Sequence, residues 1–167
     1  MASTTREWQK INLAERELLE KHLNEVPVKL GAIAKDLGID VKLSSLPLNI
    51  SGQIAKTPAG YEIKINRHES RQRQRFTLAH ELAHFLIHRD IIDRLGGTLT
   101  DNVLYRSGAS ESIEYEANRL ASQIVMPEGA LRDAYSRFGG NISESMVELL
   151  AEQFGVSKAA MEIRMAA

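Results

Sequence analysis

The chain has 167 residues, 43% of them hydrophobic, and a formal net charge of −1. That length predicts one compact domain with a small appendage, and the hydrophobic content is enough for a buried core. The charge argues against a nucleic-acid or membrane surface, and the absence of cysteine excludes disulfides, cysteine-ligated zinc and thiol catalysis. Without an apolar signal core near Met1, or an apolar run long enough to span a membrane, the sequence predicts a soluble, cytoplasmic protein.

The N-terminal part of the sequence predicts helices. Residues 6–24 carry apolar side chains at helical spacing among charged ones, which indicates one amphipathic helix ending before Pro27. A second, short helix is expected over residues 28–37 and ends at Gly38. This second segment could be half of a helix-turn-helix, but no basic recognition helix follows it. Ordinary helical packing is therefore the better interpretation.

The next segment, residues 40–66, alternates apolar and polar side chains as a strand does. A turn signal at residues 57–60 divides it and predicts a hairpin of residues 50–56 and 60–66. We expect residues 60–66 to form an edge strand, to which an extended peptide can add as a further strand. The predicted fold class is α+β, with a small antiparallel sheet packed beside a mostly helical domain.

A helix is expected over residues 69–88. The glycine- and serine-containing stretch that follows, residues 89–111, predicts a loop that is either functional or simply connecting. Three helical segments come after it, over residues 112–125, 128–138 and 143–165. We expect residues 1–127 to form the core of the protein and residues 128–167 to form a helical extension packed on it.

The helix over residues 69–88 contains His80-Glu81-Leu82-Ala83-His84, a His-Glu-x-x-His pattern. Residues four apart share one face of a helix, so both imidazoles can reach one metal ion. Glu81 lies about 100° round the same helix, near enough to act as a base on a water molecule at that metal. The opposite face is apolar, so the helix can pack on the core while its histidines face a site.

A catalytic zinc ion takes three protein ligands and keeps one position for water. A longer form of the motif, H-E-x-x-H-x-x-G-x-x-H, supplies the third ligand from the same segment. Here Ile87 stands in place of the glycine, which leaves no easy turn, and Asp90 in place of the last histidine. His88 lies about 12 Å from His80 along the helix. That is too far to share the ion, so we interpret His88 as an exposed histidine at the helix end.

The carboxylates at the start of the next helix are the remaining candidates for a third ligand. Glu114 borders the apolar stripe of that helix, whereas Glu116 lies beyond its other edge and Glu111 lies in or before the first turn. A carboxylate at a buried margin needs a partner, and a metal ion is one. We therefore favour Glu114, with Glu116 as the alternative. Asn118, one turn on, can hydrogen-bond to the ligands from behind.

Hydrolysis at a zinc site of this kind also needs a donor for the oxyanion that forms during catalysis. Tyr105, in the expected loop, and Tyr115, on the next helix, are candidates for that donor, and structural roles are the alternative for both.

Two blocks of sequence, residues 75–88 and 114–127, resemble the ImmA/IrrE family of zinc metallopeptidases. The second block of that family has the form E-x-E/Q-A-N/D-x-F-A followed by L-L-M-P, and its first Glu is the metal ligand. Glu114 matches that position. The resemblance covers about residues 26–127. Its departures, such as Ala83 for a common Gly and Leu120 for a common Phe, touch no ligand.

The resemblance implies a zincin-like core and Zn²⁺ as the cofactor. Several family members cut a helix-turn-helix repressor, and others act as toxin components paired with one. It therefore implies a zinc-dependent endopeptidase that cleaves a repressor or antitoxin and relieves repression in stress response, phage or mobile-element transfer. The alternatives are a regulator that sequesters its partner without cutting it and a hydrolase of small molecules. Direct nucleic-acid binding is not expected, because no complete DNA-binding domain is evident.

Overall fold

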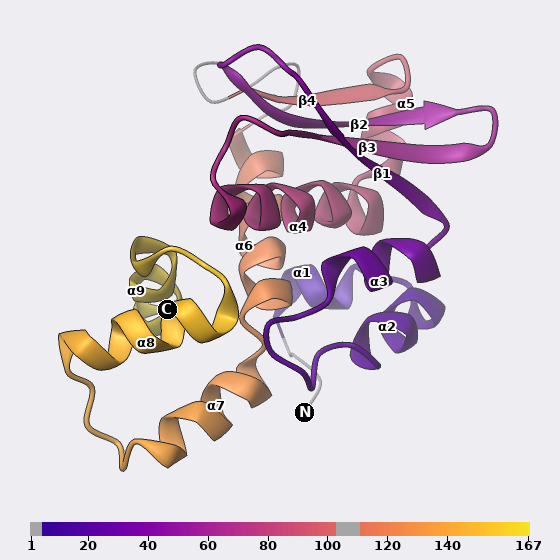
Figure 1. Ribbon diagram of the computed structural model, residues 1–167. Helices are drawn as coiled ribbons and strands as arrows, with labels where there is room; N and C mark the ends of the chain where they lie inside the picture. Colours follow the sequence, from indigo (N-terminus) through magenta and orange to yellow (C-terminus); the bar gives the residue numbers. More distant parts are fainter. Residues whose placement is uncertain (1–4, 103–110) are drawn as a thin grey trace.

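The computed structural model describes residues 5–102 and 111–167, which form helices and one four-stranded sheet (Figure 1). The first helices are α1 (Arg6–Gln9), α2 (Leu13–Glu20) and α3 (Leu30–Asp36). The strands are β1 (Ile39–Ser44), β2 (Ile50–Thr57), β3 (Gly60–Asn66) and β4 (Thr98–Asn102). Between and after them come α4 (Arg71–Ile87), α5 (Arg89–Arg94), α6 (Glu111–Val125), α7 (Glu128–Arg137), α8 (Glu144–Phe154) and α9 (Lys158–Ala166). The α+β class is confirmed.

The strand order in the sheet is β1-β3-β2-β4. The predicted hairpin of β2 and β3 is confirmed, but β1 pairs in parallel with the other side of β3, so the sheet is mixed rather than antiparallel. The expectation that residues 60–66 form an edge strand is therefore wrong. The edges of the sheet are β1 and β4, and a peptide that adds as a strand has to use one of these.

The stretch expected to be a loop contains regular structure. Residues 89–94 form α5, and β4 pairs antiparallel with β2, with Leu99 opposite Ile54. Both of these side chains are buried, which explains why β4 is held to the sheet despite its weak apolar pattern. The loop expectation is wrong for these two elements.

The expectation of a single helix over residues 6–24 is also wrong, because the helix is interrupted between α1 and α2. The Asn12 side chain accepts a hydrogen bond from the Glu15 backbone N–H at 2.9 Å and donates one to the Glu15 carboxylate, also at 2.9 Å. This reciprocal capping starts a new helix. It also lets Trp8 of α1 and Ile11, which lies in the break, both enter the core.

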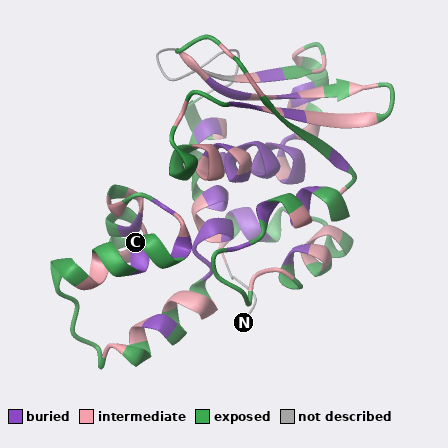
Figure 2. Ribbon diagram, in the orientation of Figure 1, coloured by how far each residue is buried: buried purple, intermediate pink, exposed green. Residues whose placement is uncertain are grey.

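Helix α4 lies directly beneath the sheet, and its side chains are buried from the middle of the helix onward (Figures 1 and 2). Ser70 caps its first turn by accepting from the Arg73 backbone N–H. The contact with the sheet is close at Gly52 of β2. A Cβ atom there would lie 2.7 Å from the Thr77 side chain, so only glycine lets the strand approach α4 this closely.

The last three helices extend to one side of the molecule (Figure 1). Residues 143–165 split into α8 and α9 at Gly155, which has φ +69°. Phe154, before that turn, and Val156, after it, are buried in the same hydrophobic cluster as the core helices. The predicted division of the chain at residue 127 stays a prediction. No helix in residues 5–102 and 111–167 is long and apolar enough to cross a membrane.

Candidate metal centre

Helices α4 and α6 pack against each other and bring together His80, His84 and Glu114. His80 Nε2 lies 3.0 Å from Glu114 Oε2, and His84 Nε2 lies 3.3 Å from Glu114 Oε1. The two Nε2 atoms are 3.1 Å apart. All three side chains are buried, and within the described ranges of the chain they form a group that could hold a metal ion.

The spacing of these three side chains suits zinc. A tetrahedral zinc ion with ligand bonds of about 2.1 Å separates its donor atoms by about 3.4 Å. The two Nε2 atoms, 3.1 Å apart, are close to that separation, and each lies within 3.3 Å of one oxygen of the Glu114 carboxylate. Two imidazole nitrogens and one carboxylate are also a donor set of catalytic zinc sites, which leave a further position for water.

Asn118 of α6 determines which ring nitrogen of His80 carries the proton. His80 Nδ1 lies 2.8 Å from Asn118 Oδ1. An amide oxygen only accepts, so Nδ1 carries the proton and donates it, and the lone pair is on Nε2. His80 Nε2 is the atom that faces Glu114. Asn118 therefore contacts His80 at the nitrogen opposite to the one that faces Glu114.

His88 contradicts the prediction of an exposed histidine at the helix end, because its exposed fraction is 2%. Its Nδ1 atom lies 2.9 Å from His84 Nδ1, and its Nε2 atom lies 3.3 Å from Glu116 Oε1. The other carboxylate oxygen of Glu116 pairs with Lys10, the residue that follows α1. Glu116, the alternative third ligand, thus faces His88 and Lys10, whereas Glu114 faces the two histidines of the motif.

A family model of the IrrE N-terminal-like domain, the M78 peptidases, matches residues 34–166. The chain belongs to this family. A transcriptional regulator of Mycobacterium tuberculosis has a similar fold, with a TM-score of 0.61 and 18% identity over 92% of this chain. The match covers 45% of that protein, so the chain spans less than half of the regulator's length. No protein of curated function matches the sequence.

Glu81 is the remaining charged residue of the His-Glu-x-x-His motif. Glu81 follows His80 on α4 and is fully buried. Burying a carboxylate costs desolvation free energy, so a buried carboxylate normally has a function or a charged partner.

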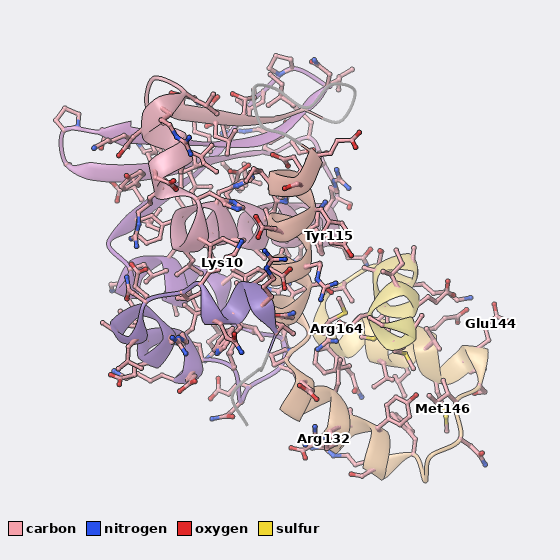
Figure 3. The ribbon with its side chains drawn as sticks, turned by 180° about the vertical axis from the view of Figure 1, so that it is seen from behind. Lys10, Tyr115, Arg132, Glu144, Met146 and Arg164 are labelled. Carbon is pink, nitrogen blue, oxygen red and sulfur yellow. The ribbon has the colours of Figure 1, made fainter. Side chains whose placement is uncertain are left out.

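Of the other residues considered for the site from the sequence, those that the structure describes do not contact this group of side chains. The Tyr115 side chain is 59% exposed, and its hydroxyl accepts a hydrogen bond from Arg119 at 3.2 Å. Figure 3 shows Tyr115 on the side of α6 away from α4. Asp90 is exposed and pairs with Arg94 at 3.3 Å, and Glu111 is exposed. Tyr105 lies outside the described residues.

Burial sets the protonation of the ligand group. It lowers the pKa of His84 from 6.5 to about 4, although hydrogen bonding to Glu114 opposes the change. Burial alone raises the pKa of Glu114, but hydrogen bonds and charge interactions with His80 and His84 outweigh it and bring the pKa well below its usual value. At neutral pH the group therefore holds a neutral His84 and an ionised Glu114, the forms that bind a metal ion.

The roles of two residues at this centre were missed from the sequence: His88 was taken as an exposed histidine, and Lys10 was not considered. His88 is four positions after His84, so the same helical spacing that identifies the motif was a signal for it. Lys10 has no local signal, because only the docking of α1 brings it to Glu116.

Proposed function

We propose that this M78 family protein is a zinc-dependent endopeptidase. His80, His84 and Glu114 hold the ion, and Glu81 is the general base. The observation that carries the proposal is the convergence of Glu114 on the two histidines of a His-Glu-x-x-His helix, at distances that suit zinc. The family match supports a peptidase in particular.

The residues divide the chemistry among them. When bound, zinc supplies a Lewis acid that activates water and polarises the scissile carbonyl group. Glu81 takes a proton from the attacking water and passes it to the nitrogen of the leaving amine as the peptide bond breaks. Asn118 keeps the His80 lone pair on Nε2 through the hydrogen bond at Nδ1.

We further propose that the substrate is a helix-turn-helix repressor or antitoxin. The sequence resemblance to ImmA/IrrE proteins supports this choice. The fold shared with a transcriptional regulator is consistent with it, although that protein is more than twice as long as the matched region. Cleavage of the repressor would relieve repression.

The test is Glu81→Gln in the full chain, incubated with a repressor encoded beside it. Gln is nearly isosteric but cannot take the proton, so zinc content and fold should be kept while cleavage slows by about 10²–10⁴-fold. Fragments are followed on a gel, with zinc measured on the same samples. Equal cleavage by both proteins removes Glu81 from the mechanism. A wild type that binds the repressor tightly yet never cuts it, whatever the metal and pH, supports sequestration instead.

A further inference from the structure

A continuous line of polar contacts leads from the metal group to the first helix. His84 Nδ1 lies 2.9 Å from His88 Nδ1, and His88 Nε2 lies 3.3 Å from Glu116 Oε1. Glu116 Oε2 in turn pairs with the ammonium group of Lys10. His84 and His88 are buried, and Glu116 is nearly so. Lys10 reaches this line from the end of α1, beside α4 and α6 (Figure 3).

The positions of the protons along this line follow from the contacts. A neutral imidazole donates through one nitrogen and accepts through the other. If the lone pair of His84 is on Nε2, its proton is on Nδ1, which donates a hydrogen bond to His88 Nδ1. His88 then carries its own proton on Nε2, which faces the Glu116 carboxylate, an acceptor.

The reverse arrangement fails at the far end. With the proton of His84 on Nε2, His88 would have to donate through Nδ1. Its Nε2 lone pair would then face a Glu116 oxygen at 3.3 Å, and two acceptors would repel each other. The first arrangement satisfies both contacts of His88. With a metal ion held between His84 Nε2 and Glu114, it also directs the His84 lone pair to that ion.

We propose that His88 and Glu116 are positioning residues for the metal ligand His84, and that Lys10 holds Glu116 in place. The inference rests on the proposed zinc site. Hydrogen bonds to the far nitrogen of a ligating histidine fix its ring and tautomer and make it a stronger donor to the metal. The two histidines of the motif are thus supported differently, His80 by a neutral amide and His84 by a line that ends in an ion pair.

Helix α1 and its two capping residues, Thr5 and Lys10, contact α6 at three points, so the Lys10 contact is not isolated. The Thr5 hydroxyl donates to Gln123 Oε1 at 2.8 Å, and Glu7 pairs with Arg119 at 3.3 Å. The Lys10–Glu116 pair is the third point. Helix α1 lies outside the residues matched by the family model, 34–166. The N-terminal part of this chain therefore supplies a group that the matched region lacks.

The test compares the zinc affinity of full-length variants by competition with a chromophoric chelator. His88→Leu removes both hydrogen bonds at a similar side-chain size, and zinc should bind about 10–100-fold more weakly. His88→Asn retains an acceptor close to the place of Nδ1, so it should recover much of the affinity. His22→Leu is the matched control, because it removes a histidine–carboxylate pair, His22 with Asp36, that lies apart from the metal group. Its affinity should not change.

A second measurement separates positioning from folding. The absorption bands of the cobalt-substituted protein report the ligand field, so they should shift in His88→Leu and return towards wild type in His88→Asn. Glu116→Gln should have a smaller effect than His88→Leu, and Lys10→Met the smallest. Wild-type affinity and spectrum in a folded His88→Leu would overturn the proposal. So would equal losses in His88→Leu and His88→Asn, which indicate packing alone.

The outcome also separates this inference from the proposed function. A wild type that binds neither zinc nor cobalt contradicts the proposed function. The tautomer of His84 can then still be read in the metal-free protein from its ¹⁵N ring shifts. In the metal-free protein Glu114 competes for this proton at Nε2, so positioning requires a larger share of the Nδ1-protonated form in the wild type than in His88→Leu. The same share in both proteins contradicts the inference.

Discussion

Each histidine of the motif has both ring nitrogens engaged. Nε2 faces Glu114, and Nδ1 faces Asn118 in His80 or His88 in His84. A substitution at either histidine therefore removes a donor to the metal and also leaves a buried partner without its hydrogen bond. The loss of metal and a loss of stability should appear together.

We expect the purified protein to bind one zinc ion per chain and His80→Ala or His84→Ala to lose it, because two remaining ligands hold zinc weakly. Plasma emission spectroscopy on dialysed protein gives the metal content. His68→Ala is a suitable control, since His68 lies in the turn after β3 and contacts Ser45. Equal zinc in the wild type and both motif variants would show that the metal binds elsewhere.

Glu114→Ala should weaken zinc much more than Glu116→Ala. Glu114 places one carboxylate oxygen within 3.3 Å of each Nε2 atom, whereas Glu116 acts only through His88. We expect about tenfold weaker binding for Glu116→Ala, the lower end of the usual range for such partners. The loss in Glu114→Ala should be far larger. Zinc titrations of the two proteins in parallel measure the difference. If they coincide, or if Glu116→Ala is the weaker binder, Glu114 is not the third ligand.

At the level of helices and strands, the contact between β2 and α4 holds the motif helix beneath the sheet. Gly52→Ala would place a Cβ 2.7 Å from the Thr77 side chain and 2.9 Å from the Lys64 carbonyl oxygen. Because a backbone atom has to move, we expect a destabilisation of about 1–3 kcal/mol. Urea unfolding followed by circular dichroism measures it.

Gly31→Ala is the control for that experiment. Gly31 lies in α3, and a Cβ there meets nothing within 4 Å in the described structure. Alanine should be neutral or stabilise the helix by up to about 1 kcal/mol. A Gly52→Ala protein as stable as wild type would mean that the strand and α4 can separate without loss.

The elements that the sequence predicts well are those with a long apolar period. Helices α4 and α6 begin and end close to the predicted positions, because their apolar residues recur at helical spacing. The break before α2 was accessible in principle, since Asn12 and Glu15 have the spacing of a capping pair. Strand β4 was not, because its assignment depends on pairing with a strand far away in the sequence.

The same distinction between local and distant contacts applies to the metal centre. His80, His84 and Glu114 follow from helical geometry and a recognisable pattern, so the sequence predicts the group that the structure brings together. The surroundings of His88 depend on where α1 docks. The apolar pattern of the sequence does not predict that docking, so the prediction that His88 is exposed was wrong.

The stability of the whole metal-free protein should depend on pH through this centre. The pKa of His84 is about 4 in the folded chain, whereas its usual value is 6.5. Between these pH values the side chain is protonated in the unfolded chain but stays neutral in the folded chain. Stability should therefore fall as the pH drops from about 6.5 to 4, by up to roughly 3 kcal/mol. The lowered pKa of Glu114 continues the loss below its usual value of 4.5.

Urea unfolding in the presence of a chelator, at a series of pH values, measures this dependence. His84→Asn lacks the titrating group, so its stability should change less between pH 6.5 and 4. Metal-free wild type that is equally stable across this range would contradict a neutral, buried His84.

The three side chains proposed to hold zinc belong to two helices, so a bound ion would also be a cross-link between α4 and α6. An ion that binds the folded chain and not the unfolded one stabilises it by RT ln(1 + [L]/Kd), about 2.7 kcal/mol at a hundredfold excess over Kd. The lifetime of the chain against degradation would then depend on the zinc concentration around it. Metal shortage would remove both the activity and, in time, the polypeptide itself, and the abundance of the protein would follow the metal supply.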